Sequence, residues 1–316
     1  MATIRDQRSL EEALEDAWTL MAAGGLAPKT IADYRDKMRL FTRFLARETG
    51  AAPIVGDFRL ERAVEFALLR RHRGTLSRST LRSDAMNLRG VSLWLQRSGV
   101  TREHRLAQLP TPRGSSDDGR VLDEEELEVL AAAARGLTWT ARRTRAMLAV
   151  LLDAGVRVSE LVALDTTDVD LRTGVVAVTY PAKGGPKRRA VLGRDAQQLL
   201  RDALGPQPAP GPLFASTAGG TGRLTTGAVR SLLQRLSERA DVERVSPHDF
   251  RRTGSTHTLV NGLDRDLHAA LYGWRTDNAS SRGRYLILSD AQLAAVVGPY
   301  LPVDRLGLFA RRPRRR

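Results

Sequence analysis

Two short segments hold arginines in settings that suit the binding of a phosphate group. In DAGVRVSEL, Arg157 follows a helix break predicted at Gly155. In SPHDFRRT, His248 and Arg251 are three residues apart, so they lie on one face of a helix near its N-terminus. The free N–H groups and the positive dipole at that end attract anions. Because arginine donates two parallel hydrogen bonds and stays charged, both segments indicate phosphate chemistry.

Each segment also has a structural explanation that needs no ligand. Arg157 can simply pair with Glu160, and His248 with Arg251 can be an ordinary polar pair on a solvated surface. The motifs that are absent narrow the chemistry, since the sequence has no GxxxxGK[ST] loop, no HExxH motif and no aspartate cluster with metal-ligand spacing. We therefore expect catalysis without ATP, cofactor or metal ion, with arginines meeting the charge of the transferring group.

Five elements in a fixed order resemble a known family. They are AGVRVSEL, a lysine at a predicted hairpin tip, PHDFRRT, LYGW and a later RY. Together they resemble the tyrosine recombinases, also called phage integrases, from about Arg120 to Tyr300. The helical first part, with PKTIADYRDKMRLFTRFL, is similar to the core-DNA-binding domain of that family.

The resemblance implies that four residues surround the scissile phosphate. Arg157 and Arg251 match the two arginines that grip it, and Glu160 occupies the acidic position that supports the active-site arginine. Trp274, in LYGW, falls where most members have His and some have Trp. An indole N–H is sufficient to donate to a non-bridging oxygen, and fixed guanidinium groups stabilise charge that builds in the transition state.

The resemblance gives the bond-breaking steps to three other residues. Tyr285 matches the nucleophile, Lys183 the lysine that protonates the leaving 5′ oxygen, and His248 the residue that transfers a proton beside the second arginine. A phenol with an ordinary pKa of about 10 attacks as its anion only when nearby cations favour that form. The segment before Tyr285 is slightly longer than the family pattern. Tyr272 and Tyr300 are alternative nucleophiles, although packing or surface roles suit them better.

Elements that must position these residues divide the chain in two. Apolar residues at helical spacing follow Pro28, with Thr30 as the expected cap, and recur from Leu81 to Leu95. A stretch rich in Pro, Gly, Ser and charged residues then predicts a linker. The predicted divisions are a helical core-DNA-binding domain (1–110), a linker (111–120), a catalytic domain (121–302) and a basic C-terminal tail (303–316).

Capping and turn signals organise the second domain. Asp123 with Glu126 predicts a capping box at the start of a helix. Two strands, 175–180 and 188–192, flank a turn with Lys183 at its tip, which predicts a β-hairpin. The predicted fold is mainly α with a small β-sheet. It is a two-domain clamp around DNA, with a helical N-terminal domain and a mixed α/β catalytic domain of the integrase type.

Charge supports a polyanionic partner. The 316 residues include 50 Lys and Arg against 36 Asp and Glu, a net charge of +14, although an arginine-rich proteome would give the same excess. A cluster of arginines before and within the second helical stripe is the candidate contact with the DNA backbone. Its members are Arg70, Arg71, Arg73, Arg78, Arg82 and Arg89.

Other features limit the location and the chemistry. No apolar run is long enough to span a membrane and the N-terminus is polar, so a cytoplasmic, nucleoid-associated protein is expected. The chain has no cysteine, which excludes disulfides and thiol nucleophiles.

The function that these observations predict is site-specific recombination through a 3′-phosphotyrosine intermediate, in integration, excision or dimer resolution, as in mobile elements. The expected partners are double-stranded DNA with an inverted-repeat core site and three further copies of the chain, forming a homotetramer on two sites. Accessory DNA-bending proteins are possible. The alternatives are a type IB topoisomerase and a non-catalytic DNA-binding protein of the same fold. The segment LSDAQLAAVVGPYL either docks on a neighbouring copy or packs on its own domain.

Overall fold

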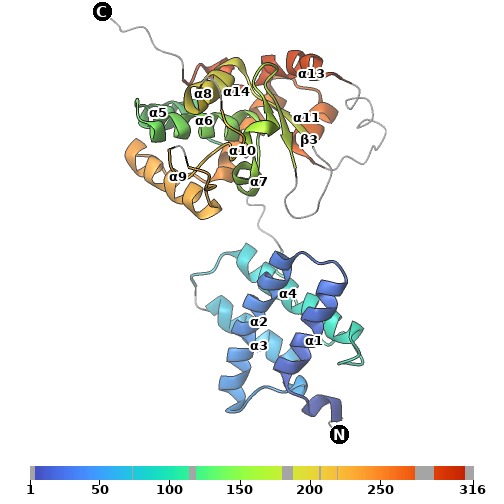
Figure 1. Ribbon diagram of the computed structural model, residues 1–316. Coiled ribbons are helices and arrows are strands. Elements are labelled where there is room, and N and C mark those ends of the chain that lie inside the picture. Colours follow the sequence, from blue (N-terminus) through green and yellow to red (C-terminus); the bar gives the residue numbers. More distant parts are fainter. Residues whose placement is uncertain are drawn as a thin grey trace, which may run out of the picture. The chain divides into compact units, whose positions relative to one another are not determined.

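The computed structural model describes residues 4–72, 74–113, 119–179, 188–205, 208–218, 220–274 and 288–309. The chain divides into two compact units, Met1–Asp118 and Gly119–Arg316 (Figure 1). The division falls inside the segment whose composition predicts a linker. In the described residues, no helix is long and apolar enough to cross a membrane.

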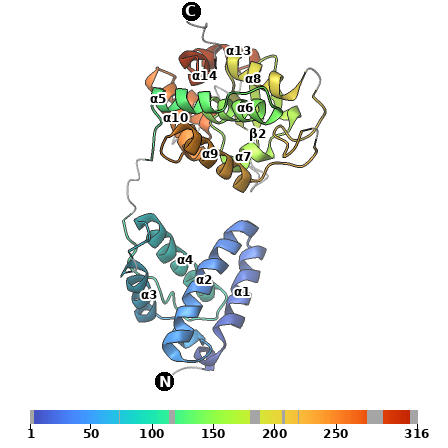
Figure 2. The same ribbon diagram turned by 90° about the vertical axis from the view of Figure 1, so that its left-hand side faces the viewer.

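The first unit is helical (Figure 2). Helix α2 buries Met38, Phe41 and Phe44, which recur at helical spacing. The ring centroid of Phe41 lies 5.2 Å from that of Phe66 and 5.8 Å from that of Phe58, so aromatic packing joins three segments of the unit. The elements are η1 (Ile4–Gln7), α1 (Leu10–Ala23), α2 (Pro28–Thr49), η2 (Val55–Asp57), α3 (Leu60–His72) and α4 (Arg78–Arg97).

A buried carboxylate ties three of these helices together. Asp84 of α4 accepts hydrogen bonds from Lys37 of α2, at 2.6 Å, and from Nη2 of Arg70 of α3, at 2.8 Å. A carboxylate removed from water needs such charged partners, so Arg70 is committed to the interior of the unit.

The second unit combines helices with one antiparallel sheet of order β1–β2–β3 (Figure 1). Val176 lies opposite Ala190 and Val178 opposite Arg188, which confirms the two strands of the predicted hairpin. Residues 180–187 between them, including Lys183, lie outside the described residues. The strands are β1 (Val169–Asp170), β2 (Val175–Val178) and β3 (Arg188–Val191).

The remaining elements surround this sheet and one central helix, α6. They are α5 (Glu124–Ala133), α6 (Trp139–Asp153), α7 (Val158–Ala163), η3 (Thr166–Asp168), α8 (Arg194–Leu204), α9 (Thr226–Ala240), α10 (Pro247–Val260), α11 (Arg265–Tyr272), α13 (Asp290–Val297), η4 (Gly298–Tyr300) and α14 (Pro302–Leu306).

Helix α6 is buried from Ala146 to its last residue, Asp153. Helix α10 crosses it at Gly254, where an added Cβ would lie 1.9 Å from the carbonyl oxygen of Leu152. Only glycine permits so close an approach of the two backbones. Because Arg251 stands three residues before Gly254 on α10, this contact sets the depth of its side chain in the unit.

The end of α6 connects segments that are far apart in the sequence. The buried carboxylate of Asp153 accepts hydrogen bonds from the N–H groups of Gly193, at 2.9 Å, and Val303, at 3.0 Å. The next residue of α14, Asp304, accepts from the N–H of Arg194 at 2.7 Å, at the start of α8. Burial raises the pKa of Asp153 to about 8, because the two hydrogen bonds offset only part of the lost hydration.

Helix α13 packs on the sheet of its own unit. Leu293 and Val297 are buried in one cluster with Val175 of β2 and Val191 of β3. In this single chain, the segment LSDAQLAAVVGPYL thus follows the second of the two arrangements that the sequence left open.

Two boundaries differ from the sequence-based prediction. The N-cap of α2 is Ala27 and Pro28 is the first helical residue, so Thr30 lies inside the first turn. Proline suits that position because its missing N–H has no partner there. The predicted tail begins too early, since Val303 and Leu308 are both buried in the main hydrophobic cluster. The short apolar segment after Pro302 carries too little periodicity to reveal this packing.

Candidate active site

Arg157 stands at the corner between α6 and α7. The chain leaves α6 through Gly155, whose φ of +53° favours glycine and where a Cβ would lie 2.2 Å from the ring of Tyr272. Arg157 is the N-cap of α7 and its side chain is 44% exposed, so its head group is accessible to a ligand.

The buried carboxylate of Glu160 binds Arg157 from the interior side of the unit. The glutamate side chain is 1% exposed, and Oε1 accepts from Nη1 of Arg157 at 2.8 Å while Oε2 accepts from the backbone N–H of Arg157 at 2.9 Å. Burial by itself would raise the pKa of Glu160, but the adjacent charge of Arg188 and the hydrogen bonds from Arg157 outweigh it. The pKa of Glu160 is therefore lowered, and the group is a carboxylate at neutral pH.

Arg251 lies deeper than Arg157. It is 3% exposed and donates to the backbone carbonyls of Gly155 and Tyr272. Burial, followed by repulsion from Arg188 and Arg157, lowers the pKa of Arg251 to about 10, so the group remains charged at neutral pH. The hydrogen bond to Gly155, two residues before Arg157, places Arg251 beside the corner that carries Arg157, although the two arginines are far apart in the sequence.

His248 lies at the exposed N-terminal end of α10, one turn before Arg251. Partial burial of its ring, and then the charges of Arg252 and Arg251, lower the pKa of His248. The imidazole is therefore neutral at neutral pH and can accept a proton.

Trp274 comes after Gly273, the C-cap of α11, and is 45% exposed. Its ring packs edge-on against His268, with centroids 5.1 Å apart, and lies 5.7 Å from the ring of Tyr272. His268 is itself buried and shares a 3.0 Å hydrogen bond with the hydroxyl of Ser255. His268, against which Trp274 packs, is thus fixed by aromatic packing on one side and by the hydrogen bond to Ser255 on the other.

Comparison with known proteins identifies this arrangement. The phage integrase family is matched over residues 120–290. The chain belongs to this family. It is 30% identical over 294 residues to the tyrosine recombinase XerC of Halalkalibacterium halodurans, an alignment that covers 87% of this chain and 92% of that protein. It is 31% identical over 277 residues to the tyrosine recombinase XerD of Xanthomonas campestris pv. campestris, covering 82% and 81%.

Solved structures of lower identity share the fold. A lambda integrase tetramer bound to a Holliday junction is 16% identical with a TM-score of 0.66, over 85% of this chain and 78% of that chain. The Tn1549 transposon integrase in complex with a circular intermediate DNA is 16% identical with a TM-score of 0.64, over 87% and 98%. The predicted fold class and the predicted recombinase activity are confirmed, and neither the topoisomerase nor the non-catalytic alternative is favoured.

In the described part of this recombinase, Arg157 pairs with Glu160, and Arg251 donates to the carbonyl of Gly155, two residues before Arg157. His248 lies one turn before Arg251 on α10, and Trp274 lies two residues after Tyr272, whose carbonyl accepts from Arg251. Two other residues predicted for the active site, Lys183 and Tyr285, lie outside the described residues, and so does Arg73. Among the residues that are described, no group of three His, Asp or Glu side chains is placed to hold a metal ion.

The two alternative nucleophiles differ in their surroundings. Tyr272 is 2% exposed, its ring fills the space beside Gly155, and burial raises the pKa of its hydroxyl. These surroundings favour a packing role for Tyr272. Tyr300, in η4, lies partly buried against the cluster that contains Leu293 and Val297.

The arginines predicted to contact DNA have separate environments in the first unit. Arg70 is bound to Asp84, as described above. Arg82 donates to the carbonyl of Pro112 at 3.0 Å and Arg89 to the hydroxyl of Thr111 at 3.2 Å, so both contact the chain that leaves this unit. Arg71 and Arg78 are exposed.

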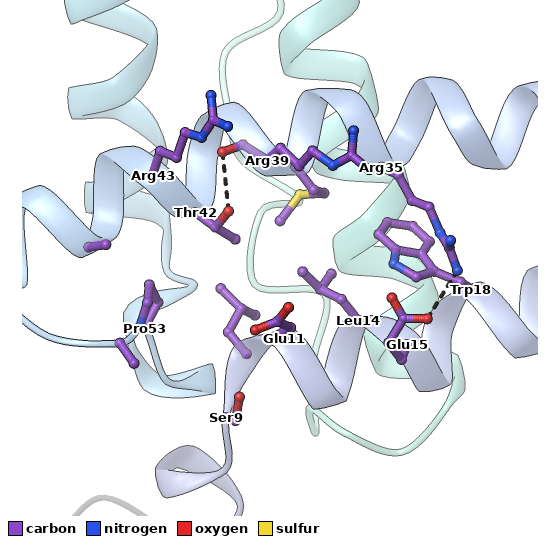
Figure 3. Close-up of a pocket in the computed structure, with 14 residues that line it drawn as sticks. Ser9, Glu11, Leu14, Glu15, Trp18, Arg35, Arg39, Thr42, Arg43 and Pro53 are labelled. Atoms are coloured by element: carbon purple, nitrogen blue, oxygen red, sulfur yellow. Dashed lines mark hydrogen bonds and ion pairs between the residues drawn. The ribbon is translucent and has the colours of Figure 1, made fainter.

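A hollow of about 410 Å³ lies between α1 and α2, and none of the residues that line it was predicted for the active site (Figure 3). Across this hollow, Nη2 of Arg35 of α2 donates a hydrogen bond to Oε2 of Glu15 of α1 at 3.0 Å, and Trp18 is one of the lining residues. Its mixed charges do not resemble the cationic cluster of the second unit.

One residue of that cationic cluster was missed by reasoning from the sequence. Arg188, at the start of β3, is 6% exposed and donates from Nη2 to Oε2 of Glu160 at 2.9 Å and from Nη1 to the carbonyl of Leu271. The available signal was a pair of arginines, Arg188 and Arg189, at the head of a strand that continues with apolar residues, because alternation turns one of the two inward.

Proposed function

We propose that this recombinase breaks DNA by attack of Tyr285 on a phosphate that Arg157 and Arg251 bind. The observation that carries the proposal is the charge of the cluster. Arg157 and Arg188 pair with the carboxylate of Glu160, Arg251 donates to the carbonyl of Gly155 beside Arg157, and together these four groups retain two positive charges. A scissile phosphate relieves this repulsion, most strongly in the transition state, where negative charge on its oxygens grows.

The remaining residues have defined tasks in this mechanism. The Oη atom of Tyr285 forms a bond to phosphorus while the bond from phosphorus to the 5′ oxygen breaks, which leaves a 3′-phosphotyrosine and a free 5′ hydroxyl. His248 takes the phenolic proton, since its lowered pKa keeps it neutral at neutral pH. Lys183 protonates the leaving oxygen, and the indole N–H of Trp274 donates to a non-bridging oxygen. Resealing needs no nucleotide, because the phosphotyrosine keeps the energy of the diester.

The assembly that we propose is a homotetramer on two double-stranded DNA sites, each with an inverted-repeat core. One of the solved structures that share the fold is an integrase tetramer on a Holliday junction, which supports this stoichiometry. The first unit would serve as the core-DNA-binding domain and the second as the catalytic domain. Accessory DNA-bending proteins and a nucleoid location belong to the same proposal.

Covalent capture tests the nucleophile. A pool of nicked 40-base-pair duplexes with randomised cores traps the protein on a 3′ phosphate, because the short strand beyond the nick diffuses away after cleavage. Mass mapping should find the attached nucleotide on the peptide that contains Tyr285. Tyr285→Phe removes only a hydroxyl, so DNA binding should persist while the adduct disappears. Attachment at Tyr272 or Tyr300, or an adduct formed by Tyr285→Phe, would overturn the assignment.

A further inference from the structure

Arg188 connects the supports of both phosphate-binding arginines. The guanidinium of an interior arginine needs partners for its charge and its N–H groups. The two partners of Arg188 lie on different elements, Glu160 on α7 and the carbonyl of Leu271 at the end of α11. Each of these elements also contacts one of the arginines that we propose to bind phosphate. Arg157 is the N-cap of α7, and Arg251 donates to the last carbonyl of α11.

The first connection runs through Glu160. Its Oε2 atom accepts from both Nη2 of Arg188, at 2.9 Å, and the backbone N–H of Arg157, also at 2.9 Å, while Oε1 accepts from the head group of Arg157 at 2.8 Å. With Arg188 in place, the carboxylate is held from behind, so its other oxygen faces Arg157. Without Arg188, the carboxylate loses its buried anchor and can rotate.

The second connection runs through the end of α11. The last carbonyls of a helix have no partner within the helix. Arg188 takes the carbonyl of Leu271, and Arg251 takes that of the next residue, Tyr272. Adjacent peptide units of one helix end therefore receive the two arginines, which sets the spacing between them.

We propose that Arg188 is a positioning residue that keeps Arg157 and Arg251 at the spacing one phosphate requires and ties both to β3, the strand that comes after the segment containing Lys183. This inference rests on the proposed function. Arg188 is almost fully buried behind Glu160, so it acts on the substrate through its neighbours.

The test uses covalent capture on a defined duplex, chosen from the sequences that the wild-type chain captures out of the randomised pool. Single-turnover rates of adduct formation are measured for Arg188→Met, Arg188→Lys, Arg157→Ala and the double variant Arg157→Ala/Arg188→Met. Arg143→Met is the matched control. Arg143 is an equally buried arginine of the same unit that donates to the carbonyls of Ala215 and Ser216 and makes no contact with the cluster.

Arg188→Met should slow adduct formation by about 100-fold, the effect expected when a catalytic group is misplaced by about 1 Å. Its affinity for the duplex in gel shifts should stay at the wild-type level, because contacts with many other phosphates dominate binding. Arg188→Lys keeps the charge and one hydrogen bond, so its rate of adduct formation should lie between those of the wild-type chain and Arg188→Met. Arg143→Met should lower the melting temperature and leave the rate unchanged.

The double variant separates positioning from general stability. If Arg188 acts by setting the spacing between Arg157 and Arg251, that spacing no longer matters in a chain that lacks the Arg157 side chain. Arg188→Met should therefore slow Arg157→Ala far less than it slows the wild-type chain. Three outcomes would overturn the inference while the proposed function stands. They are a rate loss in the double variant equal to the product of the two single losses, a wild-type rate for Arg188→Met, and an equal slowing by Arg143→Met. Absence of any adduct with the wild-type chain would overturn both. If Arg188→Met does not fold, Arg188→Lys completes the same cycle.

Discussion

Replacing Glu160 with glutamine removes one negative charge from a position that three N–H groups share. The amide keeps one acceptor oxygen, and its best orientation leaves that oxygen facing the backbone N–H of Arg157 and Nη2 of Arg188. Its NH₂ group then faces the head group of Arg157, which is 44% exposed and can turn toward water. The main loss is the countercharge of the buried Arg188, and breaking a buried pair in this way costs about 3–5 kcal/mol.

We expect Glu160→Gln to lie at the lower end of that range, because one of its two arginines is solvated. A loss of about 3 kcal/mol should lower the melting temperature of the second unit by roughly 6–12 °C, measured by calorimetry. Asp165→Asn is the control, since it breaks a carboxylate–arginine pair with Arg223 that is 34% and 42% exposed and is worth at most about 1 kcal/mol. Equal destabilisation by the two substitutions would refute the buried-pair argument.

The pH dependence of the same pair has a definite sign. The pKa of Glu160 is lowered in the folded protein, so its carboxylate stabilises the fold fully above the ordinary glutamate pKa of about 4.3. That contribution is lost as the pH falls through the lower, folded-state pKa. Wild-type and Glu160→Gln stabilities should therefore differ by a constant amount near neutral pH and converge in acid. A gap that widens on acidification would contradict this sign.

Three further predictions concern the reaction on DNA. Affinity should fall steeply with salt, with a log–log slope that corresponds to roughly five or more neutralised phosphates, and a flat response would contradict the DNA clamp. Adduct formation should proceed in excess EDTA and without ATP, so a strict magnesium requirement would refute the arginine-based mechanism. Lys183→Ala should react slowly on an ordinary duplex and recover on one with a 5′-bridging phosphorothiolate, whose sulfur leaves without protonation. If the reaction rate of Lys183→Ala does not recover on that duplex, Lys183 is better interpreted as a phosphate contact than as the general acid.

Local patterns predicted much of the fold. The capping box of Asp123 and Glu126 is present at the start of α5, and the apolar spacing of α2 is buried as expected. Such signals lie within one or two helical turns, so the sequence displays them directly. The two-residue strand β1 carries no comparable signal and was not predicted.

The candidate active site depends on contacts between residues that are far apart in the sequence, and the spacing of residues along the chain does not reveal such contacts. Arg157 and Glu160 are three residues apart, so their pairing was foreseeable, whereas the meeting of Arg157 with Arg251 followed only from the family resemblance. Strand alternation places Arg188 and Arg189 on opposite faces but does not say which of them is buried. Counting charges likewise could not separate Arg70, which is committed to Asp84, from an arginine that is available to DNA.

The hydrogen bond from Val303 to Asp153 has a consequence for the order in which the chain acquires its structure during synthesis. Asp153 closes the core helix α6, but its partner is made 150 residues later. Until α14 has left the ribosome, the carboxyl of Asp153 lacks the N–H of Val303, and the start of α8 lacks the cap from Asp304. We therefore expect a nascent recombinase to keep its catalytic unit open until translation has passed α14, so that a chain still being made does not cut DNA.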